Sequence, residues 1–259
     1  MLLSEGGSAP GVGPIHVDEI EATLAPLERA LGIKLYDNML GSAGKKQFSG
    51  DIDCAIDVHP DDIAVLGKKI QDSPLTLYFA KTSVFITKIK IQDYDPNREE
   101  MDPITGKSKG IPQGRTGYVQ LDYMPGDPGW MKTYYHSPSE KESKYKGVYR
   151  NIMIATMCAL WERESSEERT ADDRAMEVTR WIWSPSKGLV RIKRVPKPRA
   201  DGNGYTKAHI DTDLQKPITK PDQIAKALGL TSGADLHSFE TIHKAIKKNY
   251  KPELYQKII

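Results

Sequence analysis

Two aspartates separated by a single residue are the first positions in this chain whose type and spacing indicate chemistry. Asp51 and Asp53 lie in the segment Asp51–Val58, where apolar residues alternate with acidic or small ones. An alternation of period two predicts a β-strand, so the two carboxylates should point to the same face. Carboxylate oxygens are preferred ligands of hard divalent cations. We therefore expect this strand to hold a pair of Mg²⁺ ions, or Mn²⁺ ions in their place.

A third carboxylate occurs in a later segment. Tyr118 to Met124 is predicted to form a short strand, and Asp122 lies within it. A carboxylate from a neighbouring strand can position a metal ion and accept a proton from a hydroxyl group whose pKa that ion lowers. The sequence thus predicts that Asp51, Asp53 and Asp122 are both the metal ligands and the catalytic residues.

A Gly-Ser pair precedes these acids. Gly41 and Ser42 follow the segment Lys34–Leu40, which we expect to be a strand, and they open a turn that continues to Gly50. Backbone N–H groups in such a corner bind phosphate oxygens, and a serine hydroxyl can add a contact. Gly41 and Ser42 are therefore expected to contact the phosphates of a nucleotide.

The same turn carries Lys45, Lys46 and Ser49. The lysines are expected to meet triphosphate oxygens or the backbone of an acceptor as point charges, and Ser49 directly precedes Gly50 and the acids. The alternative is that the two lysines only keep an exposed loop soluble.

A basic and aromatic stretch follows the third acid. Within it, Lys144 and Arg150 are expected to contact phosphate, and Tyr149 to stack on a base. The alternative interpretation is a solvated basic helix. Further along, Trp181 and Trp183 lie near basic residues, as in a nucleic-acid groove, although a half-buried hairpin explains that pattern equally well.

The elements that must position these residues alternate between helix and strand. Apolar residues at helical spacing predict a helix over Val17–Leu31, and β-forming residues predict one or two strands in Leu75–Ile91. Gln92–Arg115 is polar, contains three prolines and is expected to be a long loop or hairpin. Further helices are expected at Pro60–Ile70, Trp130–Tyr135, about 139–164, 220–228 and 238–249, with a β-hairpin near 178–195.

These elements predict an α/β fold of the α+β kind. A mixed-sheet catalytic domain would span residues 1–137, and a mainly helical region would span 138–259. The length of 259 residues is sufficient for one large domain or two modest ones.

The order and context of these groups resemble the nucleotidyltransferase superfamily that includes DNA polymerase beta, CCA-adding enzymes, poly(A) polymerases and antibiotic nucleotidyltransferases. Its motif is a hydrophobic residue followed by Gly-Gly or Gly-Ser, then Asp-hydrophobic-Asp or Asp-hydrophobic-Glu, and a third carboxylate on a later strand. Gly41-Ser42, Asp51-Ile52-Asp53 and Asp122 match this motif. A closer likeness, over roughly residues 1 to 160, is to nucleotidyltransferases predicted in bacteriophages. It includes these segments: Leu3–Gly7, Gly44–Lys46 and Ser49-Gly50.

The resemblance implies a polymerase-beta-like mixed sheet of four or five strands backed by helices. It also implies transfer of a nucleoside monophosphate from a nucleoside triphosphate, ATP by default, with release of pyrophosphate. An RNA 3′ end is the favoured acceptor hydroxyl, and a protein or small-molecule hydroxyl is the alternative. A nucleotide-binding or assembly protein without turnover is the rival from another class.

The composition of the chain bears on the class of protein and on its location in the cell. The hydrophobic fraction of 38% is typical of a globular protein, and no apolar run approaches the roughly 20 residues of a membrane span. Cys54 and Cys158 have no neighbouring ligands at zinc spacing. Because Met1–Gly13 lacks a basic leader, we expect a cytoplasmic protein, in the host cytoplasm if a phage encodes it. The sequence leaves the oligomeric state open.

Overall fold

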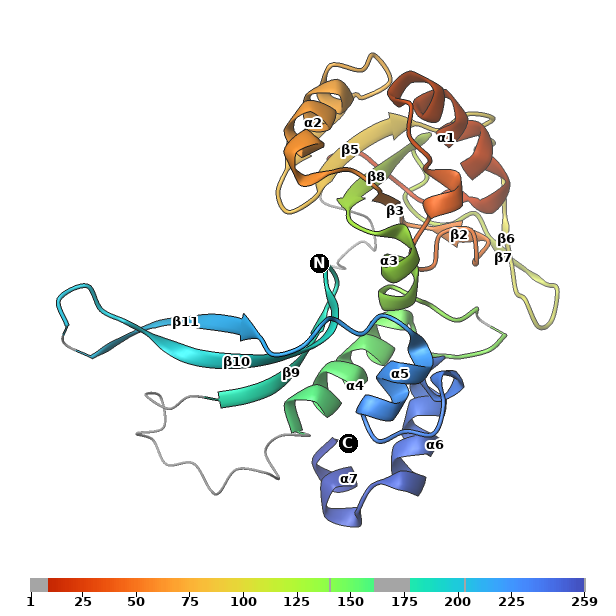
Figure 1. Cartoon of the computed structure of the whole chain (residues 1–259). Helices are drawn as coiled ribbons and strands as arrows, with labels where there is room; N and C mark the ends of the chain where they lie inside the picture. The colour runs from red at the N-terminus through yellow and green to blue at the C-terminus, as the bar shows by residue number, and fades with distance from the viewer. Residues whose placement is uncertain (1–8, 140, 161–177, 203, 259) are drawn as a thin grey trace. The chain divides into compact units, whose positions relative to one another are not determined.

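The computed structural model describes residues 9–139, 141–160, 178–202 and 204–258. The chain divides into two compact units, 1–144 and 145–259 (Figure 1). The division falls after Lys144, beyond the expected boundary at 137. The segment Leu3–Gly7, which contributed to the phage resemblance, lies outside the described residues.

A four-stranded mixed sheet forms the centre of the first unit. Its strand order is β3-β8-β5-β4, in which β3 and β8 run parallel and the other neighbours are antiparallel. The expected strands around the acids and within Leu75–Ile91 are therefore confirmed. Their bounds are β3 Asp51–Ile56, β4 Tyr78–Lys81, β5 Phe85–Lys90 and β8 Tyr118–Pro125.

Helices α1 (Val17–Leu31) and α2 (Ile63–Gln71) pack with the sheet in one hydrophobic core (Figure 1). The apolar positions of α1 that predicted this helix are buried, and Pro26 lies inside the helix. The alternate positions of β3 and β8 contribute to the same core; these are Ile52, Cys54, Ile56, Val119, Leu121 and Tyr123. Because side chains alternate along a strand, the residues between them face away from this core.

The segment Lys34–Leu40 is not the strand that the sequence suggested. It contains a short 3₁₀ helix, Tyr36–Asn38, and only Met39 forms an isolated bridge, to Cys54. The Glu28 carboxylate accepts hydrogen bonds from the backbone N–H groups of Leu35 and Tyr36, at 2.6 and 2.9 Å. A side chain thus satisfies these donors, so the backbone can turn instead of joining a sheet. The helix expected at Pro60–Ile70 likewise begins as a 3₁₀ turn, Pro60–Asp62, before α2.

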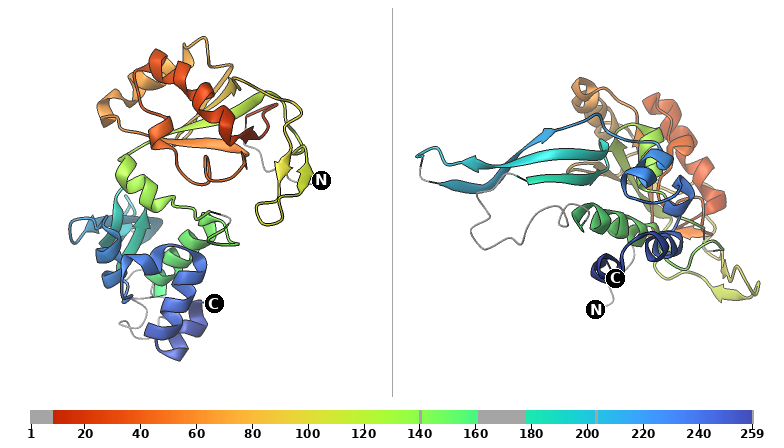
Figure 2. Two further views of the ribbon diagram at one scale, coloured as in Figure 1. Left: turned by 90° about the vertical axis from the view of Figure 1, so that its right-hand side faces the viewer. Right: turned by 60° about the horizontal axis from the view of Figure 1, so that its bottom comes forward.

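Three smaller elements complete the first unit. The strands β1 (Ile15–His16) and β2 (Phe48–Ser49), of two residues each, pair antiparallel. Gln92–Arg115 was expected to be a long loop or a hairpin, and it contains a hairpin of β6 (Glu100–Met101) and β7 (Ser108–Gly110). This hairpin extends from the unit as an arm (Figure 2). Helix α3 (Pro128–Tyr134) follows β8 and has Asp127 as its N-cap.

The second unit combines helices with an antiparallel sheet of order β11-β10-β9. The hairpin expected near 178–195 is present as β9 and β10. The sequence did not indicate β11, the third strand of this sheet. Helix α4 begins at Gly147, later than expected, and the stretch 161–164 lies outside the described residues. The bounds are α4 Gly147–Leu160, β9 Val178–Ser184, β10 Gly188–Pro198, β11 Tyr205–Asp213, α5 Pro221–Ala227, α6 Phe239–Asn249 and α7 Pro252–Ile258.

Within the described residues, none of the helices combines the length and apolar character that a membrane span requires.

Candidate functional site

The parallel pairing of β3 with β8 brings the three predicted carboxylates together. Asp53 lies opposite Asp122 in the register, and Asp51 lies opposite Gln120. All four residues occupy positions that alternate with the buried core positions of their strands. Strand pairing places opposite side chains of one face about 5 Å apart at their Cβ atoms. The acids therefore form one cluster on the face of the sheet that points away from α1 and α2.

The electrostatics of the cluster reflect this crowding. Burial, followed by the charges of Asp51 and Asp122, raises the pKa of Asp53 to about 7. Burial and the charge of Asp51 also raise the pKa of Asp122 to about 6, against a lowering by its hydrogen bonds from Gln120. Carboxylates in this position favour either a shared proton or a bound cation.

Gln120 supports the third carboxylate. Its amide nitrogen donates to both oxygens of Asp122, at 2.9 and 3.1 Å, and its amide oxygen accepts from the backbone N–H of Ala9 at 2.9 Å. The side chain is buried. Sequence reasoning missed this residue, although the period of two that linked Asp51 to Asp53 also places Gln120 on the same face as Asp122.

Gly41 lies directly beside the acids. It forms a parallel bridge with His136, and the preceding Leu40 N–H donates to the Asp53 carbonyl at 2.8 Å. The φ angle of Gly41 is 63°, and a Cβ at this position would lie 3.7 Å from Oδ2 of Asp53. Glycine therefore provides the left-handed backbone that this turn requires, and a side chain here would contact the Asp53 carboxylate. The phosphate contacts expected of Gly41 and Ser42 stay a prediction.

The turn after Gly41 is tight and basic. The Ser42 carbonyl accepts the Lys45 N–H at 3.0 Å, and the Lys45 ammonium donates to the Ser137 carbonyl at 3.0 Å. Lys46 follows in the same turn. Ser49, in contrast, is only 5% exposed on β2, which leaves almost no surface for the nucleotide contact that the sequence suggested.

The remaining predicted residues are divided between the units. Lys144 ends the first unit and is exposed, whereas Tyr149 and Arg150 lie on α4 of the second unit. Tyr149 is 48% exposed and makes an edge contact with Tyr145. Arg150 is only 3% exposed and its guanidinium donates to the Leu236 carbonyl, which indicates a packing role within that unit rather than a phosphate contact.

Tyr135, which the sequence did not single out, also lies close to the acids. Burial raises the pKa of its hydroxyl, and the charges of Tyr134 and Asp53 raise it further. It directly precedes His136, the bridge partner of Gly41. The segment after α3 therefore borders the site.

The donor set fits a hard divalent cation. Three carboxylates on adjacent strands supply oxygen ligands, and the charge they concentrate needs compensation. Among the described residues, however, no group of three histidine, cysteine, aspartate or glutamate side chains is arranged so that it could hold a metal ion. Asp122 is instead held by Gln120, so a cation would have to draw the oxygens together.

A scan of protein-family models finds no match to this chain, and a search of curated proteins finds none either.

Proposed function

We propose that this chain is a metal-dependent nucleotidyltransferase. The observation that carries the proposal is the register of β3 and β8, which sets Asp53 opposite Asp122 with Asp51 on the same face. Burial first, and then the neighbouring carboxylates, raise the pKa values of Asp53 and Asp122. The turn at Gly41, next to Asp53, has the left-handed backbone of a corner whose N–H groups could meet a phosphate group. The motif resemblance to the polymerase-beta superfamily supports the same chemistry.

The proposed reaction joins an acceptor hydroxyl to a nucleoside monophosphate. The hydroxyl oxygen attacks the α-phosphorus of a nucleoside triphosphate, ATP by default, and the bond from that phosphorus to the bridging oxygen of pyrophosphate breaks. The acceptor proton passes to Asp122 or to solvent, and pyrophosphate leaves. An RNA 3′ end remains the first choice of acceptor, with a protein or small-molecule hydroxyl as the alternative.

The chain's own residues have distinct roles in this proposal. Asp51, Asp53 and Asp122 would hold the divalent cations, which when bound supply charge neutralisation at both ends of the displacement. Gln120 keeps Asp122 oriented through two hydrogen bonds. Gly41 and Ser42 present a corner to the phosphates.

A nucleotide-binding protein without turnover is the rival. Three clustered carboxylates cost stability unless a cation or protons compensate them, which favours a protein that uses the cation. The two hypotheses differ in one observable, since only the transferase releases pyrophosphate.

The test is pyrophosphate release from each of the four ribonucleoside triphosphates with Mg²⁺ or Mn²⁺ and pooled RNA. We expect release and labelled RNA with the wild type and their loss in Asp51→Asn/Asp53→Asn. The matched control is Asp57→Asn, which changes an exposed acid just beyond β3. Release that persists in the double variant would contradict the proposal, and nucleotide binding without release would establish the rival.

A further inference from the structure

The segment that precedes β1 lies against the sheet that carries the acids. Residues 9–14 read Ala-Pro-Gly-Val-Gly-Pro, a composition that favours neither a helix nor a strand. The segment accordingly contains no helix or strand in the structure. Its first residue, Ala9, is nevertheless only 4% exposed. Contacts with distant parts of the chain therefore hold this segment in place.

Backbone groups of the 9–14 segment make these contacts. The Gly13 N–H donates to the carbonyl of Tyr118, the first residue of β8, at 2.8 Å. The Pro10 carbonyl accepts from the Lys88 ammonium at 3.1 Å. Lys88 lies on β5, directly opposite Gln120 of β8. The segment is thus attached to the two strands next to the strand that bears Asp51 and Asp53.

The end of the segment is attached to the residues that follow the β6–β7 arm. A Cβ on Gly13 would lie 1.9 Å from the Gly114 carbonyl oxygen, so only a glycine permits the two chains to cross this closely. The Pro14 carbonyl accepts from the Arg115 guanidinium at 3.2 Å. These contacts define where the segment crosses the exit of the arm.

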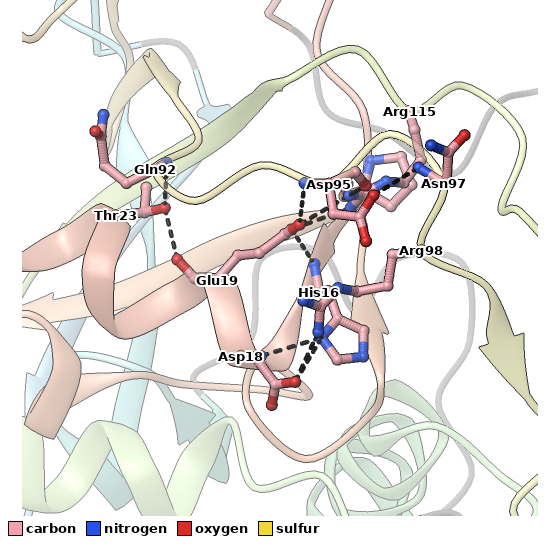
Figure 3. A network of polar contacts seen from close by, with 10 residues as sticks. His16, Asp18, Glu19, Thr23, Gln92, Asp95, Asn97, Arg98 and Arg115 are labelled. Carbon is pink, nitrogen blue, oxygen red and sulfur yellow. Dashed lines mark hydrogen bonds and ion pairs between the residues drawn. The ribbon is translucent and has the colours of Figure 1, made fainter.

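Arg115 is itself held by a buried ion pair (Figure 3). Glu19 on α1 accepts from two nitrogens of Arg115, at 2.8 and 3.1 Å, and from the Asp95 N–H at 3.2 Å. The side chains of Glu19 and Arg115 are only 1% and 2% exposed. One buried carboxylate therefore anchors both stems of the arm, at Asp95 and at Arg115, and through Arg115 it also anchors the 9–14 segment.

The other end of the segment reaches the carboxylate site. The Ala9 N–H donates to the amide oxygen of Gln120 at 2.9 Å, and the amide nitrogen donates to both oxygens of Asp122, at 2.9 and 3.1 Å. A backbone N–H can only donate, so the oxygen of the amide must face it. The amide nitrogen, which is the only donor of the Gln120 side chain, is therefore directed at Asp122.

The reverse orientation of the amide is unfavourable while the segment is in place. Two donors would then face each other at Ala9, and the amide oxygen would face the Asp122 carboxylate. Gln120 is only 3% exposed, so water has little access to satisfy the groups that such a reversal would leave unpaired. The Ala9 N–H thus selects the amide orientation that supports Asp122.

We propose that the 9–14 segment is a positioning element of the carboxylate site, in which Ala9 fixes the amide of Gln120 and thereby orients Asp122. This inference rests on the proposed transferase function, because it concerns the metal ligands of that site. Ala9 acts only through Gln120 and is a positioning residue. Since coupling between two sites is reciprocal, a docked segment should favour cation binding, and a bound cation should favour the docked segment.

The first test compares two substitutions in the metal-free protein. Ala9→Pro removes the N–H that Gln120 accepts, whereas the conservative variant Ala9→Gly keeps it. The measurement is solvent exchange of the Gln120 side-chain amide protons by NMR, with their signals identified by their absence in Gln120→Ala. We expect slow exchange in the wild type and in Ala9→Gly, and exchange at least about tenfold faster in Ala9→Pro.

The second test is a double-mutant cycle measured by calorimetry with Mg²⁺ alone. We expect Ala9→Pro to weaken Mg²⁺ binding about tenfold, as the loss of an outer partner of a metal ligand commonly does. In the Gln120→Ala background the same substitution should change the Mg²⁺ affinity by less than about twofold, because its effect passes through Gln120. A segment that only stabilises the fold would weaken binding equally in both backgrounds.

A further measurement does not depend on the folding of Ala9→Pro. Hydrogen exchange at the Ala9 amide should become faster in Gln120→Ala and slower when Mg²⁺ binds to the wild type. Equal effects of Ala9→Pro in the two backgrounds, equal losses in Ala9→Gly and Ala9→Pro, or no Mg²⁺ binding by the wild type would each overturn the inference.

Pyrophosphate release separates this inference from the transferase function. If the cycle shows the expected coupling but no triphosphate releases pyrophosphate, the transferase fails and the positioning role stands. If the wild type releases pyrophosphate and Ala9→Pro does so with an unchanged Mg²⁺ requirement, the positioning role fails and the transferase stands.

Discussion

Asp53 on β3 and Asp122 on β8 lie opposite each other in the parallel register. Their pKa values are raised to about 7 and about 6, respectively. The folded chain therefore retains protons that the unfolded chain would release. The stability that Asp53 contributes is present below its unfolded pKa of 3.8 and is lost as the pH rises through about 7. At neutral pH without a cation, the site opposes folding.

Asp53→Asn should consequently stabilise the metal-free protein. The amide removes one charge from the cluster, and we expect the Tm at pH 7.5 in EDTA to rise by about 2–6 °C, with little difference at pH 4.5. Mg²⁺ should stabilise the wild type but not the variant. Thermal unfolding across this pH range, with and without Mg²⁺, measures both effects. A variant that melts below the wild type in EDTA at pH 7.5 would show that repulsion at Asp53 is not significant.

Gln120→Ala should lower the metal affinity while leaving the fold intact. Asp122 would lose two hydrogen bonds that orient it, and loss of such a partner commonly weakens a metal site by about 10–100-fold. The measurement is the Mg²⁺ concentration that gives half-maximal pyrophosphate release, with Gln92→Ala as a control at a partly buried glutamine away from the acids. An unchanged Mg²⁺ requirement would assign Gln120 to packing alone.

Gly41→Ala tests the requirement for a glycine beside Asp53. The new methyl group would lie 3.7 Å from Oδ2 of Asp53, and the φ of 63° would add roughly 1 kcal/mol of strain. We expect triphosphate binding to weaken about tenfold or more. Gly114→Ala separates strain from position, because Gly114 also has a positive φ, of 83°, but a Cβ there has no atom within 4 Å. Equal losses in both variants would mean that backbone strain alone is responsible.

Glu19→Gln should destabilise the first unit. Arg115 would remain buried with a neutral partner, and breaking a buried ion pair typically costs about 3–5 kcal/mol. Burial raises the pKa of Glu19, but hydrogen bonds from Arg115, His16 and Asp95 outweigh it and lower the pKa. The stability that Glu19 contributes is therefore present above its unfolded pKa of 4.5 and lost as the pH falls through the lower folded value. Urea unfolding at pH 7 and pH 3 measures this, with the exposed Glu21→Gln as control.

Arg150→Met distinguishes packing from phosphate binding. Leu236 would lose the donor to its carbonyl, and we expect a loss of about 2–3 kcal/mol from the second unit. The KM for the triphosphate should stay within about twofold if the role is packing. A large rise in KM together with unchanged stability would restore the phosphate contact that the sequence suggested. Unfolding curves and initial rates of the same preparation provide both values.

The strands around the acids were predictable because their alternation is local. An alternation of period two specifies the two faces of a strand without knowledge of its partner. The strands expected at Asp51–Val58 and Tyr118–Met124 are accordingly present, as Asp51–Ile56 and Tyr118–Pro125. The strand expected at Lys34–Leu40 was wrong because Glu28, in the preceding helix, satisfies its backbone donors. The conformation of Lys34–Leu40 thus depends on a side chain from another element. A local sequence pattern does not contain that information.

The surroundings of the site were predicted less completely for the same reason. The sequence placed Lys45 and Lys46 near the acids, but it did not indicate the cavity that they line, because that cavity also requires the arm near Glu100, which is distant in the chain. The phosphate contact expected of Arg150 rested on its charge and on its position after the third acid. Arg150 is buried because α4 packs within the second unit and its guanidinium donates to the Leu236 carbonyl. Both are tertiary contacts.

The anchoring of both stems by Glu19 also makes the arm a self-contained module. Its tip can be shortened, lengthened or replaced between Pro103 and Ser108 without disturbing the ion pair that positions it. Changes in the length or sequence of this tip should therefore leave the sheet and the carboxylates of the first unit in place.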